Sequence, residues 1–156
     1  MSTYLLLKWV HILSAILLFG TGLGSAFYKF MTSRTGDVRA IAVTDRLVVL
    51  ADWLFTTPTI IIQPLTGLAM VWLTGMPLST PWIAASFGLY FLAGACWLPV
   101  VWLQIRMRRM AAHATTASAP LPDAYRRYAR IWFWLGVPAF IAMVAVVGLM
   151  VFRPAF

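Results

Sequence analysis

Four long apolar segments alternate with three connections of different character along the chain. A membrane-spanning helix needs about 20 mostly apolar residues, because each residue advances the helix by about 1.5 Å. Segments of this kind cover about residues 4–30, 47–73, 82–103 and 131–152. The pattern therefore predicts an all-α, polytopic membrane protein, in which four transmembrane helices form one bundle and residues 1–156 form a single domain.

Composition supports this prediction. The chain has 156 residues, of which 62% are hydrophobic and only 10% are charged, whereas soluble domains carry about 25% charged residues. Such a chain cannot cover its own surface with polar groups. We therefore expect the lipid bilayer to be the solvent of most of the molecule.

Basic residues are concentrated in two of the three connections, and the short second connection has no charge. Lysine and arginine accumulate in cytoplasmic loops, so we expect the first and third connections to face the cytoplasm and both termini to lie outside, in the periplasm. No nucleic-acid recognition motif accompanies the net charge of +8, and we expect no nucleic-acid partner. The basic residues of the two connections are Lys29, Arg34, Arg39, Arg46, Arg106, Arg108, Arg109, Arg126, Arg127 and Arg130.

The connections also carry helix start and stop signals. Asp37 is a suitable N-cap, so a helix is expected to begin near Val38 and to run into the second span without a break. Small and polar residues fill the stretch at about 111–122, which predicts a flexible cytoplasmic linker. Asp123 follows this stretch and is expected to be the N-cap of the fourth helix.

Prolines and glycines interrupt the spans. Pro58 and Pro64 each remove a backbone hydrogen bond from the second span, and polar side chains gather around them. These side chains either line a polar cavity or satisfy the kinked backbone, and the second interpretation is favoured. Gly20 and Gly24 form a G-x-x-x-G pattern, interpreted as close helix packing within the bundle rather than a dimer contact. The polar side chains are those of Thr56, Thr57, Thr59 and Gln63.

Ionisable residues inside a span are candidates for function because burying them in lipid is unfavourable. His11 lies in the outer half of the first span, and Lys8 precedes it by about one turn. The imidazole has three interpretations: a hydrogen-bonding group, a ligand of a metal or haem iron, or a proton carrier. Lys8 either extends its ammonium to the membrane surface or binds an anionic group such as a haem propionate.

Other residues bear on these alternatives. His113 is expected in the cytoplasmic linker, which excludes a bis-histidine haem within one chain. Methionine sulfur binds haem iron or copper(I), although it is also a common filler of apolar cores. Asp52 is expected near the cytoplasmic end of the second span, where it forms a salt bridge with Arg106 or Arg130 or serves as a proton relay. The methionines at a suitable depth are Met70, Met76, Met143 and Met150.

Several stretches of the chain resemble a bacterial family of predicted integral membrane proteins, domain-of-unknown-function family 2269. The stretches include "LKWVHILSAILLFGTG" and "TPTIIIQPLTGLAMVW". The resemblance is carried by the Lys8-x-x-His11-Ile12 pattern, by the Gln63–Gly67 segment and by Leu149-Met150-Val151 with Pro154. It covers nearly the whole chain and implies a multi-pass protein of the bacterial inner (cytoplasmic) membrane.

The same residues are distantly similar to two other groups, the copper-resistance D-like membrane domains and the membrane-type haem-containing protoporphyrinogen oxidases. The oxidases also begin a span with a lysine, two residues and a His-Ile pair. This similarity implies that His11 is an axial ligand of haem b. The oxidases carry further histidines that have no counterpart in spans two to four here, so the similarity does not extend to oxidase activity.

The leading functional hypothesis is a small redox-type membrane protein that binds one b-type haem through His11, with Lys8 as a propionate partner. The chain has no glutamate and no paired carboxylates, so we do not expect acid–base hydrolysis. Whether the protein is an enzyme of another kind stays open. The alternative is a scaffold or subunit without a cofactor, in a homo-oligomer or with a membrane partner. Copper handling by His11 and the outer methionines, and small-molecule transport, are weaker hypotheses.

Overall fold

The computed structural model describes residues 2–154, which fall into two compact units, Met1–Met76 and Pro77–Phe156. The described residues are helical and contain no strand, which confirms the all-α class. Four helices of the described part are long and apolar enough to cross a membrane. These are Thr3–Ser33, Val38–Thr74, Pro81–Thr116 and Asp123–Phe152, and they confirm the predicted number and order of spans.

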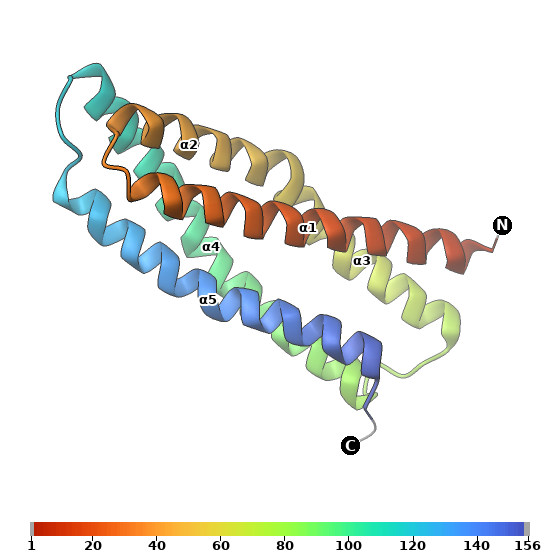
Figure 1. The fold of residues 1–156 in the computed structure, drawn as a ribbon. Coiled ribbons are helices and arrows are strands. Elements are labelled where there is room, and N and C mark those ends of the chain that lie inside the picture. The colour runs from red at the N-terminus through yellow and green to blue at the C-terminus, as the bar shows by residue number, and fades with distance from the viewer. Residues whose placement is uncertain (1, 155–156) are drawn as a thin grey trace. The chain divides into compact units, whose positions relative to one another are not determined.

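The first unit pairs one straight helix with one interrupted helix (Figure 1). Helix α1 covers Thr3–Ser33 and packs against α2 (Val38–Ala51), the π-helical turn η1 (Asp52–Thr56) and α3 (Thr57–Thr74). The carboxylate of Asp37 accepts hydrogen bonds from two backbone N–H groups of the first turn of α2, at 2.9 and 3.2 Å. The predicted N-cap and the predicted helix start at Val38 are therefore confirmed.

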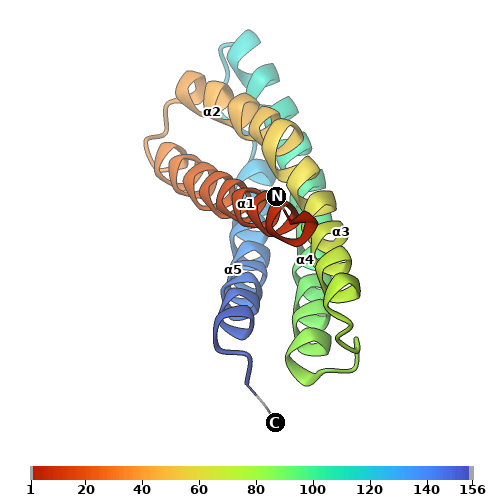
Figure 2. The same cartoon turned by 90° about the vertical axis from the view of Figure 1, so that its right-hand side faces the viewer.

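The second span is one helical path (Figure 2), and a π turn at η1 interrupts its α geometry just before Pro58, where the sequence predicts a kink. In η1 the backbone N–H of Thr57 donates to the carbonyl of Asp52, five residues earlier. Pro58 follows at once, and a proline has no N–H and crowds the carbonyl four residues before it. We attribute the widened turn to this proline, since an extra residue in the turn relieves the crowding.

Helix α1 extends beyond the predicted end of the first span at residue 30, whereas α2 begins where predicted. Helix α1 continues through Lys29 to Ser33, and α2 already contains Arg39 and Arg46, so only residues 34–37 lie between the helices. A helix is not required to end at the edge of the hydrocarbon region, and both helices continue with polar residues beyond their apolar runs. The consequence for the site is that Lys29 is a buried helical residue and not a loop residue.

The second unit consists of α4 (Pro81–Thr116) and α5 (Asp123–Phe152), which pack against each other along their lengths (Figure 1). Buried residues of α4 recur every seven positions, the spacing expected for two helices packed lengthwise. They include Ser86, Ala93, Val100, Met107 and Ala114.

Two predictions about the third connection are wrong. Residues 111–116 of the predicted linker belong to α4, because this stretch is rich in alanine, the best helix former, and Ala111 and Ala114 are buried. His113 is consequently an exposed residue of the last turn of α4. Asp123 is the first residue of α5 rather than its N-cap, a position held by Pro122, and its carboxylate lies 3.7 Å from Arg126 instead.

The outward faces of the spans are strongly apolar. Large hydrophobic side chains such as Trp72, Phe91 and Phe152 are 81%, 70% and 82% exposed. A soluble protein rarely leaves contiguous apolar surface of this extent open to water. These faces are suited to contact with the lipid bilayer in which a membrane protein sits.

Candidate functional site

His11 is held against α3 by two contacts. Its side chain is 9% exposed, and its Nδ1 atom lies 2.7 Å from Oγ1 of Thr66. The Gln63 side-chain amide donates a hydrogen bond of 2.9 Å to the backbone carbonyl of His11. Residues from two consecutive turns of α3 thus fix both the ring and the backbone of this residue.

The hydrogen bonds of Thr66 assign the tautomer of His11. The Thr66 hydroxyl oxygen lies 2.7 Å from the carbonyl oxygen of Ile62 and 3.2 Å from that of Gln63. A carbonyl only accepts hydrogen bonds, so the single hydroxyl proton is used there, and Thr66 must accept from His11. The neutral imidazole therefore carries its proton on Nδ1 and presents a lone pair on Nε2, an atom for which we find no hydrogen bond among residues 2–154.

Gly67 lies beside the edge of the imidazole ring. A Cβ atom added at this glycine would stand 3.6 Å from Cε1 of His11, the ring carbon between the two nitrogens. This distance is an ordinary van der Waals contact. A methyl group therefore fits at this position, whereas a larger side chain would press against the ring of His11.

Polar contacts continue from His11 toward η1. The Ser14 hydroxyl donates a bond of 3.4 Å from α1 to the carbonyl of Thr59. The Thr59 hydroxyl contacts the carbonyl oxygens of Phe55 and Thr56, at 2.7 and 2.9 Å. Thr59 thus bonds to the carbonyls four and three residues before it, as Thr66 and Thr74 do, and the compensation of Pro58 by a hydroxyl stays a prediction. The Thr56 hydroxyl donates to the carboxylate of Asp52, at 2.9 Å.

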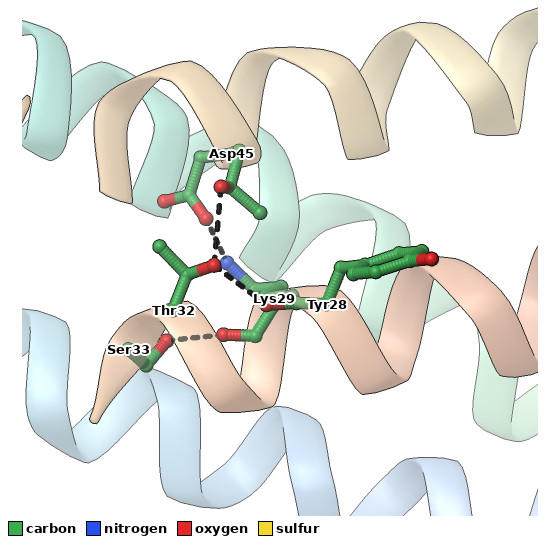
Figure 3. Close-up of polar contacts among 6 residues, drawn as sticks. Tyr28, Lys29, Thr32, Ser33 and Asp45 are labelled. Carbon is green, nitrogen blue, oxygen red and sulfur yellow. Dashed lines mark hydrogen bonds and ion pairs between the residues drawn. The ribbon is translucent and has the colours of Figure 1, made fainter. Parts of the chain in front are cut away.

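A buried ion pair lies between α1 and α2, near the turn at residues 34–37, and the sequence analysis does not identify it. The ammonium of Lys29 donates a hydrogen bond to Asp45 Oδ1, and both side chains are only 1% exposed (Figure 3). Residues at similar distances from a short turn meet when two helices pack antiparallel. Lys29 lies four residues before the last residue of α1, and Asp45 lies seven residues after the first residue of α2. Antiparallel packing brings these positions within about one helical turn of each other, and this spacing is the signal that would have found the pair.

Hydroxyl groups surround this ion pair. The Thr32 hydroxyl donates to the carbonyl of Tyr28 at 2.8 Å, and the Thr44 hydroxyl donates to the Thr32 oxygen at 3.3 Å (Figure 3). The Ser33 hydroxyl donates to the carbonyl of Lys29 at 2.7 Å. The end of α1 is therefore joined to α2 by polar contacts rather than by apolar packing alone.

The remaining predicted site residues are spread over the two units. Lys8 is exposed and lies one turn before His11 in α1, while Met70 and Met76 are half-buried in the same unit. Met143 and Met150 are half-buried in α5. Among the described residues, no group of three or more His, Cys, Asp or Glu side chains is placed to hold a metal ion.

The predicted partners of Asp52 belong to the second unit. Arg106 is exposed and its guanidinium lies 5.2 Å from the ring centroid of Trp102, and Arg130 is exposed in α5. A salt bridge from Asp52 to either arginine would join the two units and stays a prediction.

The glycine-rich face of α1 makes no close helix contact within its own unit. A Cβ atom added at Gly20, Gly22 or Gly24 would meet no described atom within 4 Å. Close packing at the G-x-x-x-G pattern, expected from the sequence, is thus not formed inside the described part of the first unit.

Comparison with known proteins assigns the family. The profile of one family, described as "Predicted integral membrane protein (DUF2269)", matches residues 5–154. Searches of the curated proteins and of the solved structures found no match. The matched region includes the two buried polar contacts described above, His11 with Thr66 and Lys29 with Asp45. Since the match covers nearly the whole sequence, the chain belongs to the DUF2269 family of predicted integral membrane proteins.

Proposed function

We propose that this chain is a small redox-type membrane protein that binds one b-type haem, with His11 as an axial ligand through Nε2. One observation carries the proposal, namely the hydrogen bond of 2.7 Å between His11 Nδ1 and Thr66 Oγ1. Histidines that bind metals almost always donate their other ring N–H to a neighbouring group, which fixes the tautomer and the ring orientation. Thr66 provides this partner for His11.

Other residues of the first unit would serve a haem held by His11. The exposed ammonium of Lys8, one turn away on α1, is a suitable partner for a propionate. Met70 and Met76 of the same unit are the candidates for a sixth ligand, and without one of them the iron would be five-coordinate. A bound haem would supply one-electron transfer.

Sequence similarity supports the same assignment. The Lys8-x-x-His11-Ile12 pattern resembles the start of a span in the membrane-type protoporphyrinogen oxidases, which contain haem. We carry over only the axial role of the histidine, because the further histidines of those oxidases have no counterpart in the later spans of this chain.

We further propose a bacterial inner-membrane protein with both termini outside. The connections at residues 34–37 and 117–122 would then be cytoplasmic, because the basic residues cluster at the helix ends beside them. In this orientation His11 lies in the outer half of the membrane, with the Lys29–Asp45 pair toward the cytoplasm.

Haem content of the purified protein tests the proposal. After expression with ample haem, the wild-type chain is expected to retain haem in detergent, and His11→Ala is expected to lose it. His113→Ala is the matched control, because it removes the other histidine, an exposed residue of α4. A colourless wild-type protein, or equal haem content in wild type and His11→Ala, would contradict the proposal.

A scaffold or partner subunit without a cofactor is the second candidate. It is favoured by the face of α1 that carries Gly20 and Gly24. This face is open at both glycines and is suited to close approach by a helix of another chain or of a second copy. Full function of His11→Ala together with stable co-purification of a membrane partner would support it.

Copper handling and small-molecule transport are further alternatives. Metal analysis of the purified protein tests the copper alternative.

A further inference from the structure

The buried polar side chains of the first unit share one helix interface. Six of them form a row that we call the polar seam, and each is at most 8% exposed. One member comes from α1, and the other five follow one another along α2, η1 and α3, which pack against α1. The members of the polar seam are Lys29, Asp45, Asp52, Thr56, Thr59 and Gln63.

The polar seam covers the part of the second span that lies nearest to the turn at residues 34–37. The path from Asp45 to Gln63 rises about 27 Å at about 1.5 Å per residue. The hydrocarbon core of a bilayer is about 30 Å thick. Gln63 lies 11 residues, or about 16 Å, before the end of α3 at Thr74, so the seam ends inside the span. The next buried polar contact toward that end is the one between His11 and Thr66.

Two separate side-chain pairs lie within the polar seam. Lys29 pairs with Asp45 at one end, and the Thr56 hydroxyl donates to Asp52 Oδ1 at 2.9 Å in the middle. A hydroxyl both donates and accepts, and it reverses direction by rotating about one bond. The Thr56 hydroxyl can therefore stabilise the carboxylate form of Asp52 and can also accept a hydrogen bond from the protonated form.

Packing requirements alone do not explain these residues. Burying a carboxylate or an ammonium is unfavourable, and apolar residues of similar volume often replace buried ion pairs without loss of stability. Intramembrane ionisable groups are typical of ion paths and proton relays. The η1 turn also places Asp52 at an irregular point of the helix, and π turns occur frequently at functional sites.

We propose that the polar seam carries protons across the membrane, with the Asp52 carboxylate as the group that is protonated and deprotonated in transit. The carboxylate binds one proton from water on one side and releases it to water on the other, and no electrons move. The ionisable groups on the elements packed against η1 are Tyr4, Lys8, His11, Tyr28 and Lys29 on α1 and Arg39, Asp45 and Arg46 on α2. The proposal does not depend on haem binding.

The apolar residues between Asp45 and Asp52 indicate how fast protons can move along the polar seam. Val48 and Val49 are 4% exposed and lie between Asp45 and Asp52 on α2. Protons must pass this segment through transient water or by movement of the helices. We therefore expect a slow proton flux rather than that of an open channel.

Proton flux into liposomes tests the proposal. The full chain is reconstituted into liposomes of phosphatidylethanolamine and phosphatidylglycerol with a pH-sensitive dye inside, and valinomycin with a potassium gradient imposes an inside-negative potential. Wild-type liposomes are expected to acidify faster than protein-free liposomes. Asp52→Asn is expected to lower the protein-dependent rate about tenfold or more, because an amide does not carry the proton.

Two variants control this result. Asp52→Glu keeps a carboxylate and is expected to retain most of the flux. Asp37→Asn removes an exposed carboxylate while keeping a good N-cap for α2, and is expected to conduct like wild type. Wild-type flux equal to that of protein-free liposomes, or Asp52→Asn flux equal to wild type, would overturn the proposal.

A measurement on the unmodified chain removes any dependence on folding of the variants. Dicyclohexylcarbodiimide reacts with protonated carboxyl groups in apolar surroundings. It is expected to abolish the flux of wild-type liposomes and to label the peptide that contains Asp52, as detected by mass spectrometry. Unchanged flux after complete labelling of Asp52 would overturn the proposal. The liposomes contain the haem-free protein, so the proton-flux test stays valid even if the protein is found not to bind haem.

Discussion

The Nδ1 atom of His11 lies 2.7 Å from Oγ1 of Thr66, and this contact joins α1 to α3 through the only buried imidazole of the described chain. Because the Thr66 hydroxyl donates its proton to a carbonyl of its own helix, the Thr66 oxygen accepts a hydrogen bond from the Nδ1–H group of His11. The orientation of the ring and the availability of Nε2 both follow from this one hydroxyl. Thr66 is thus a positioning residue for the proposed haem ligand.

Removing the Thr66 hydroxyl is expected to weaken haem binding. Thr66→Val keeps the shape of the side chain but leaves the Nδ1 proton of His11 without its acceptor. Loss of such a partner weakens metal binding about 10- to 100-fold, which a haem titration of the detergent-solubilised apoprotein measures. Thr66→Ser is expected to bind like wild type.

Thr74→Val is the control for this change. Its hydroxyl also bonds to carbonyls of its own helix, at 2.9 and 3.0 Å, but the residue is exposed. Equal haem affinity for Thr66→Val and Thr74→Val would contradict the role assigned to Thr66.

The size of the residue at position 67 is expected to matter for the same site. An added Cβ atom would rest 3.6 Å from Cε1 of His11, so Gly67→Ala should be tolerated. Gly67→Leu places further carbon atoms against the ring and should lower haem content by displacing it. The absorbance of bound haem per protein, compared with that of Gly136→Leu in open surroundings, measures the effect. Normal haem content in Gly67→Leu would argue against the ring position described.

The Lys29–Asp45 pair is expected to respond differently to single and double substitutions. Lys29→Met leaves the Asp45 carboxylate buried without its cation, which should lower the free energy of unfolding by about 3–5 kcal/mol. The double variant Lys29→Met/Asp45→Leu removes both charges and should recover most of this loss. Unfolding in mixed micelles with sodium dodecyl sulfate, followed by tryptophan fluorescence, gives both values.

The exposed Asp123–Arg126 pair serves as the reference for the buried one. Its atoms lie 3.7 Å apart in full contact with solvent, so Asp123→Asn should leave unfolding unchanged. If Lys29→Met also left unfolding unchanged, the buried pair would not contribute to the stability of the unit.

The proposed orientation predicts the behaviour of reporter fusions. Alkaline phosphatase fused after residue 156 should be active, because it folds only outside the cytoplasm, and green fluorescent protein at the same position should be dark. A fusion after Ser118, in the connection between α4 and α5, should give the reverse pattern. The reason is the cluster of arginines at the ends of these two helices. If alkaline phosphatase were active only in the fusion after Ser118, the protein would have the opposite orientation.

The spans were predictable from the sequence because lipid imposes a simple requirement on length and polarity. The start of α2 was also predictable, since Asp37 provides the N-cap that the first N–H groups need. The linker prediction at 111–122 was wrong because residue polarity was given more weight than the helix propensity of alanine. Local signals place helices well and their ends less well.

The partners of the buried polar residues were harder to predict. His11 was recognised as a candidate, but its contacts with Thr66 and Gln63 depend on which helices are neighbours, and the sequence does not state this. The sequence places Lys29 at the cytoplasmic end of the first span, where a lysine usually lies at the membrane surface. Its burial against Asp45 depends on the tight turn at residues 34–37, which brings α2 back along α1.

The measurement that tests the central claim most directly is an absorption spectrum, oxidised and dithionite-reduced, of His11→Gly with and without added imidazole. The wild-type protein, prepared from haem-replete cells, is expected to show a Soret band. His11→Gly should lack the band and regain it when imidazole occupies the space of the missing side chain. A wild-type protein without a Soret band, or a band that persists in His11→Gly without imidazole, would contradict the assignment of His11 as the haem ligand.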